Sequence, residues 1–306
     1  MSYHIVNIDS PKCSLSCRDG QLTCRSDDGE VRMLPLEDIA SIIITSFSAH
    51  LHSHLLLEAA KHGVALIICE TFKPVSLLLP ANRATDTLLT RAQVDLAEPL
   101  RRELWQRTVD AKCANQLSLA TQLAPEDPRL GALAHWAAAR HPTQEATSAK
   151  YFWAILASSL NEPSFERARD KGGLNHLLNY GYAVLLSTVL QKCFGVGLDP
   201  TFGIHHAIRE RATPLAYDLM EPFRPRVDWR VAQWVHQNPD EKSWEVTPEY
   251  RQWITTLPVE KISHHGRQLP LQGVLENTTR GFRRAVLEQT PKYYEPWTQG
   301  NSKWAG

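Results

Sequence analysis

The residues best suited to chemistry are carboxylates and imidazoles in three separate segments. Residues 197–206 end in two adjacent histidines, and residues 218–225 carry Asp218 and Glu221. A third carboxylate, Glu145, lies further upstream. Carboxylates and a neutral imidazole are ligand types that suit a metal ion acting on phosphates. Together these residues predict a metal site.

Asp218 and Glu221 are three positions apart, so on a helix their carboxylates share one face and can point into one space. Pro222 follows directly, and a proline inside a helix cannot donate its hydrogen bond and kinks the chain. The alternative for this pair alone is an amphipathic helix whose acids face water.

A loop delivers the histidine pair His205-His206, because Gly203 precedes it and residues 197–200 form a turn after a long helix. Two carboxylates and one imidazole, with positions left open, suit magnesium or manganese better than structural zinc. The nitrogen ligand favours manganese, whereas abundance in the cell favours magnesium.

The other histidine groups and motifs give weaker evidence for a functional site. The array His50-x-His52-x-His54 has a zinc-like spacing, but no acidic ligand follows until Glu58. The chain has no Gly-x-x-x-x-Gly-Lys phosphate loop, no Gly-x-Gly-x-x-Gly and no Gly-x-Ser-x-Gly elbow. These absences argue against nucleotide hydrolysis and serine chemistry.

The elements that must position these residues change in character along the chain. Up to about residue 80, short alternating runs separated by turn formers predict strands, with a helix from Ser48 to Gly63. Beyond it, helical spacing predominates, at 87–119, 129–140, 145–160, 174–194, 215–236, 249–257 and 271–287. The predicted class is α+β: a β-rich domain over 1–82, an all-α catalytic domain over 88–290, and a loosely held tail over 291–306.

Cysteine spacing, apolar runs and net charge indicate the cellular compartment and the kind of partner. The six cysteines form no Cys-x-x-Cys pair, which indicates a protein of the reducing cytoplasm, and no apolar run is long enough to span a bilayer. The formal net charge is zero, so composition alone gives no support for a nucleic-acid partner. Arginines nevertheless cluster, as solvated faces or as a groove, at 101/102/107, 167/169, 209/211, 224/226/230 and 280/283/284.

Several motifs in the same order resemble one family, the CRISPR-associated integrase of the adaptation module. Residues 218–225, 197–206 and 178–182 look like its signature, and Glu145 to Trp153 resembles its Glu-Gly-x-Ala-Ala-x-x-Tyr-Phe motif, with Ala146 in place of the glycine. The resemblance runs from about Ile5 to Leu287. Its outer stretches, which include Leu104-Trp105, Lys112 and Asn115-Gln116, are most like the type II systems.

This resemblance implies that Glu145, His206 and Glu221 hold Mg²⁺ or Mn²⁺, with Asp218 as a supporting catalytic acid. It also implies insertion of captured foreign DNA into a CRISPR array, a homodimer formed through the β domains, and a small partner protein of the same module. A catalytically silent DNA-binding scaffold is the alternative. As a hypothesis, the DNA contacts are Arg224, Arg226, Arg230, Lys150 and Tyr180.

Overall fold

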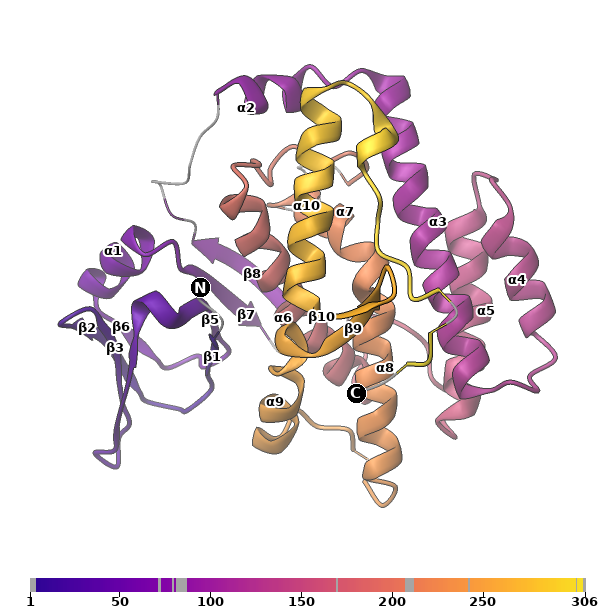
Figure 1. Ribbon diagram of the computed structural model, residues 1–306. Helices are drawn as coiled ribbons and strands as arrows, with labels where there is room; N and C mark the ends of the chain where they lie inside the picture. The colour runs from indigo at the N-terminus through magenta and orange to yellow at the C-terminus, as the bar shows by residue number, and fades with distance from the viewer. Residues whose placement is uncertain are drawn as a thin grey trace.

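A computed structural model describes residues 4–70, 73–78, 80, 87–168, 170–206, 212–241, 243–300 and 302–304. A strand-rich amino-terminal part is followed by a larger helical part, as the α+β prediction requires (Figure 1). The predicted boundary between them falls mainly on residues 81–86, which lie outside the described residues. No helix among the described residues is long and apolar enough to cross a membrane.

Two four-stranded sheets make up the amino-terminal part. One has the order β4-β3-β2-β6, with β2 (Ser14–Arg18) and β3 (Gln21–Arg25) joined by a two-residue Asp19-Gly20 turn, as its turn formers predict. The other has the order β1-β5-β7-β8, and its first three strands are parallel. The remaining bounds are β1 His4–Ile8, β4 Val31–Pro35, β5 Ile39–Ile44, β6 His50–Leu51, α1 Ser53–Lys61, β7 Ala65–Glu70 and β8 Lys73–Leu78.

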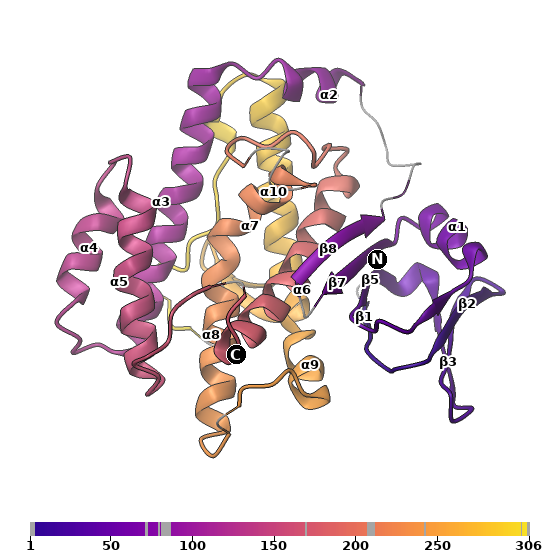
Figure 2. The same cartoon turned by 180° about the vertical axis from the view of Figure 1, so that it is seen from behind.

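Strand β5 joins two hydrophobic cores because successive side chains of a strand point to opposite faces. Ile42 and Ile44 lie in the core of the amino-terminal part, whereas Ile43 lies in the core of the helical part. Both faces are therefore buried, which explains why this parallel strand ends in three successive isoleucines, Ile42 to Ile44. The second sheet packs directly on α6 (Figure 2).

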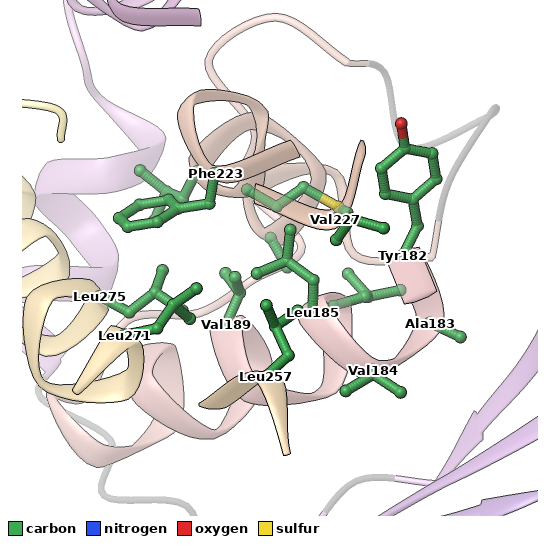
Figure 3. Close-up of a cluster of buried hydrophobic side chains, with 14 of the residues drawn as sticks. Tyr182, Ala183, Val184, Leu185, Val189, Phe223, Val227, Leu257, Leu271 and Leu275 are labelled. Carbon is green, nitrogen blue, oxygen red and sulfur yellow. The ribbon is translucent and has the colours of Figure 1, made fainter. Parts of the chain in front are cut away.

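Helix α6 (Leu174–Gly195) is buried almost all round and forms the centre of the helical part. Figure 3 shows Leu185 and Val189 of this helix facing side chains of α8 and α10. A Cβ at Gly181 would lie 2.5 Å from Cγ1 of Val227, so only glycine permits this approach of α6 to α8. The helices around it are α2 Thr87–Val94, α3 Glu98–Leu123, α4 Leu130–Ala138, α5 Gln144–Ser159, α7 Pro214–Met220, α8 Arg224–Gln237, α9 Pro248–Ile254 and α10 Leu271–Leu287.

Two predicted helices are interrupted. The helix predicted over 87–119 is divided into α2 and α3, and Pro99 stands in the first turn of α3, where a proline is tolerated. The helix predicted over 215–236 is divided by a 3-10 turn at Glu221–Phe223, which contains Pro222. This break lies where the proline was expected to kink the helix.

The prediction of a loosely held carboxyl-terminal tail is wrong. Tyr294, Trp297 and Trp304 are buried. The free energy gained by burying these large aromatic side chains exceeds the cost of ordering the polar residues between them. The indole of Trp297 donates to the carbonyl of Ser263 at 2.8 Å. Ser263 belongs to the hairpin β9 (Lys261–His264) and β10 (Arg267–Pro270), which the sequence patterns did not predict.

Candidate active site

Asp218 organises the loop that presents the histidines. Its fully buried carboxylate accepts hydrogen bonds from the backbone N–H groups of Ile204, His205 and His206, at 2.7, 3.1 and 3.2 Å. Gly203 is required at the start of this turn, since a Cβ there would lie 2.9 Å from Oδ2 of Asp218 and 2.7 Å from a backbone oxygen. The glycine three residues before the histidine therefore has a steric cause.

The same carboxylate orients His206. Its Oδ1 lies 2.7 Å from Nδ1 of the imidazole, which leaves Nε2 as the ring nitrogen that can bind a metal. Burial would lower the pKa of His206, but the hydrogen bond and charge of Asp218 raise it above its usual value. Asp218 thus uses its carboxylate to hold the loop and the imidazole, and Glu221 also acts on this imidazole through its charge.

Glu221 begins the 3-10 turn between α7 and α8, and its side chain is 4% exposed. Its Oε2 lies 2.6 Å from Nζ of Lys112, and its Oε1 lies 2.9 Å from Nε of Arg224. Burial would raise the pKa of this carboxyl, but the charges of Arg224 and Lys112 outweigh it and lower the pKa to about 2. Glu221 is therefore ionised at neutral pH.

Glu145 lies in the first turn of α5, and its side chain is 33% exposed. Its Oε1 accepts a hydrogen bond from the same ammonium of Lys112 at 2.6 Å. Burial lowers the pKa of Lys112, but Glu221 and Glu145 together raise it above its usual value. One cation of α3 thus bridges two carboxylates that are far apart in the sequence.

These contacts test whether the residues fit a divalent ion. The donor set is two carboxylates and one imidazole nitrogen, and the ammonium of Lys112 demonstrates that a cation is accommodated between the carboxylates. Among the described residues, no three His, Cys, Asp or Glu side chains lie close enough to hold a metal as they stand. The donor chemistry fits, and Lys112 lies between the two acids. The role of this lysine was missed, although the residue itself stands in a motif of the resembled family.

The supports around the site come from several elements. Asn115 of α3 donates to the carbonyl of Pro222 at 2.7 Å and so fixes the turn that carries Glu221. Arg101 donates to the carbonyl of Gly203 at 3.1 Å. The ring of Trp105 stacks on His205, with centroids 4.0 Å apart and planes within 1°, so His205 faces this tryptophan instead of the acids.

The structure corrects three of the predicted DNA contacts. Arg226 and Arg230 are 1% and 4% exposed and surround the buried carboxylate of Glu260. Tyr180 is fully buried, and its hydroxyl donates to Asn7. These side chains offer no surface to a phosphate. By contrast, Lys150 is exposed.

Arg224, at 22% exposure of its side chain, lies at the site itself. The predicted cluster at 209/211 falls outside the described residues.

The fold and the donor set together define a candidate phosphotransfer centre: a helical domain that carries two carboxylates and an oriented imidazole. A family model described as CRISPR associated protein Cas1 matches residues 6–255, and the chain belongs to this family. The family predicted from the motifs is thus confirmed.

Three comparisons illustrate the likeness. A CRISPR-associated endonuclease Cas1 from Neisseria meningitidis serogroup C (strain 8013) is 29% identical over 284 residues, which cover 91% of this chain and 90% of the relative. A casposase bound to an integration product has a similar fold, with a TM-score of 0.80 and 20% identity over 99% of this chain and 96% of that one. A Cas6-RT-Cas1–Cas2 complex matches with a TM-score of 0.78 and 15% identity over 97% of this chain and 36% of the other.

Proposed function

We propose that this protein is a metal-dependent DNA integrase and endonuclease that inserts captured foreign DNA into a CRISPR array by 3′-hydroxyl transesterification. The observation that carries the proposal is the convergence of Glu145 and Glu221 on one cation, 2.6 Å from each, beside an imidazole oriented by Asp218. Membership of the Cas1 family supports it, as do the names of the endonuclease relative and of the casposase of similar fold.

Glu145, Glu221 and Nε2 of His206 would hold a Mg²⁺ or Mn²⁺ ion. When bound, this ion would neutralise charge on the phosphate oxygens and favour ionisation of the attacking hydroxyl. Asp218 holds Nδ1 of His206, which leaves Nε2 as the nitrogen that would bind the metal ion. Arg224 and Lys112 keep Glu221 ionised, so that protons do not compete for this ligand at neutral pH.

The reaction conserves the number of phosphodiester bonds. The 3′-oxygen of the incoming DNA forms a bond to phosphorus in the target strand, while the bond from that phosphorus to the adjacent 3′-oxygen breaks. The attacking hydroxyl loses a proton and the departing oxygen gains one. With water as the nucleophile, the same site cuts the strand, which accounts for endonuclease activity without a second centre.

The assembly is part of the proposal. A protein of similar fold forms a Cas1–Cas2 complex, and we infer a corresponding small partner protein for this chain. We also propose a homodimer formed through the amino-terminal β domains, which would hold double-stranded protospacer and repeat DNA in the cytoplasm. Lys150 and Arg224 remain the candidates for phosphate contact, because they are the accessible members of the predicted set.

The test is strand transfer of a short duplex with free 3′-hydroxyl ends into a supercoiled plasmid that carries a repeat, with Mn²⁺ or Mg²⁺ and the partner protein. Loss of a metal ligand removes several kcal/mol of charge stabilisation, so Glu145→Gln should slow joining on the order of a thousandfold. Glu276→Gln is the matched control. Its side chain is 32% exposed and pairs with Lys192 and Arg280.

Joining in the wild type and the control, but not in Glu145→Gln, is the expected result. DNA binding without metal-dependent joining, equal in all three proteins, would contradict the proposal and favour a catalytically silent scaffold.

A further inference from the structure

Lys112 lies between two of the carboxylates that would hold the metal ion. Its Nζ lies 2.6 Å from a carboxylate oxygen of Glu145 and 2.6 Å from one of Glu221, and its side chain is only 10% exposed. We propose, on the basis of the proposed function, that Lys112 is a resident counter-cation that the divalent ion displaces. The ammonium holds the two acids together before the metal enters, and it competes with the metal for them.

The electrostatics require a cation at this place. Two carboxylates that face the same space repel each other, and for a nearly buried acid such as Glu221 an unpaired charge is costly. Arg224 pairs with the other oxygen of Glu221 at 2.9 Å, and the charge of Glu145 also acts on it. Lys112 makes an ion pair with each of the two acids and so keeps their carboxylates close together.

Lysine is suited to an exchangeable role. Its charge is compact and sits on a flexible four-carbon stem, whereas the planar guanidinium of arginine would bind a carboxylate in a fixed two-point geometry. The site opens on the side of Glu145, whose side chain is 33% exposed against 4% for Glu221. The displaced ammonium would therefore move toward the side of Glu145, which is the more exposed of the two acids.

The first experiment measures binding of Mn²⁺ alone by electron paramagnetic resonance, without DNA, in wild type, Lys112→Met and Lys192→Met. The control lysine has a comparable exposure of 13% and pairs with Glu276 at 3.4 Å, on α6 and α10. If the ammonium occupies the site in most molecules, its removal should tighten apparent Mn²⁺ affinity by about tenfold or more. Equal or weaker affinity in Lys112→Met would overturn the inference.

A second measurement uses only the folded wild type, so it does not depend on the variant folding. An amine-reactive reagent followed by mass spectrometry reports how accessible Lys112 is, with Lys192 as an internal control. Saturating Mn²⁺ should increase modification of Lys112 and leave Lys192 unchanged. Unchanged modification of Lys112 despite bound Mn²⁺ would overturn the displacement.

The two proposals fail in different ways. If the wild type binds no Mn²⁺ and joins no DNA, the metal-dependent function itself is contradicted. If it binds Mn²⁺ and joins DNA while both lysine measurements are flat, only the role of Lys112 is contradicted.

Discussion

Two clusters of one carboxylate and two cations lie on different faces of α8, and they have opposite electrostatic outcomes. Arg224 faces Glu221, whereas Arg226, about 200° further round the helix, faces Glu260. The charges of Arg224 and Lys112 lower the pKa of Glu221 to about 2. Around Glu260, burial prevails over both of its arginines and raises the pKa of the carboxyl.

The difference lies in what each cluster connects. Lys112 also pairs with Glu145, whose side chain is 33% exposed, so this cluster has an open side at which a ligand can enter. The guanidinium of Arg230 instead lies 3.5 Å from the ring centroid of Trp253 and donates to its carbonyl at 2.6 Å, which closes the second cluster. Similar charged groups thus form an open candidate site on one face of α8 and a closed structural joint on the other.

The largest effects are expected from Glu221 and Glu260, on two different properties. Loss of a metal ligand should make Glu221→Gln join DNA about a thousandfold more slowly. Glu260→Gln leaves Arg226 and Arg230 buried without their counter-charge, and breaking such a pair should lower the free energy of unfolding by about 3 kcal/mol. Strand-transfer rates and urea denaturation of both variants check this.

The opposite result would contradict the assignment of Glu221 to joining and of Glu260 to stability. If Glu260→Gln lost joining while its unfolding midpoint stayed at the wild-type value, the second cluster would belong to the reactive centre.

The second effect concerns the positioning of His206. Asp218→Asn keeps the size of the side chain but removes the charge that orients the imidazole. Loss of such a partner of a metal ligand typically lowers metal affinity by roughly 10- to 100-fold. We therefore expect Mn²⁺ binding, measured by calorimetry, to weaken about tenfold or more. Asp127→Asn is the control, since Asp127 is also largely buried and pairs with Arg129. Equal weakening in both variants would sink the positioning role.

The sequence predicts the local backbone around the candidate site better than its long-range contacts. Glu145, His206 and Glu221 stand in local motifs whose spacing and turn formers already indicate a loop and a kinked helix. The burial of Arg226 was not predictable, because its partner Glu260 is 34 positions away and only the folded chain brings them together. The bridging role of Lys112 depends in the same way on contacts among three separate elements.

A helix with a strong apolar period can be predicted from the sequence, whereas a segment without one cannot. Strong periodicity predicted α10 at its observed bounds, Leu271–Leu287, because one face packs against the core and the other meets solvent. The carboxyl-terminal segment has no such period, and its order depends on where Trp297 and Trp304 find partners in three dimensions.

The smallest expected effect concerns Asp228, a buried acid next to the open cluster of Glu221. Asp228 accepts a hydrogen bond from Tyr182 and is influenced by Arg224, Arg167 and Lys112, yet burial raises its pKa to about 7.

The folded protein therefore holds a proton on Asp228 that the unfolded chain has released, so stability should fall as pH rises toward 7. For this single group, the loss between pH 6 and pH 7 is about 1 kcal/mol. Asp228→Asn cannot ionise and still accepts the bond from Tyr182, so urea denaturation at the two pH values should show a correspondingly smaller change in the variant. An identical pH dependence in wild type and variant would mean that Arg224 and its neighbours keep Asp228 ionised, as they keep Glu221 ionised. Burial would then outweigh the neighbouring cations at Glu260 but not at Asp228.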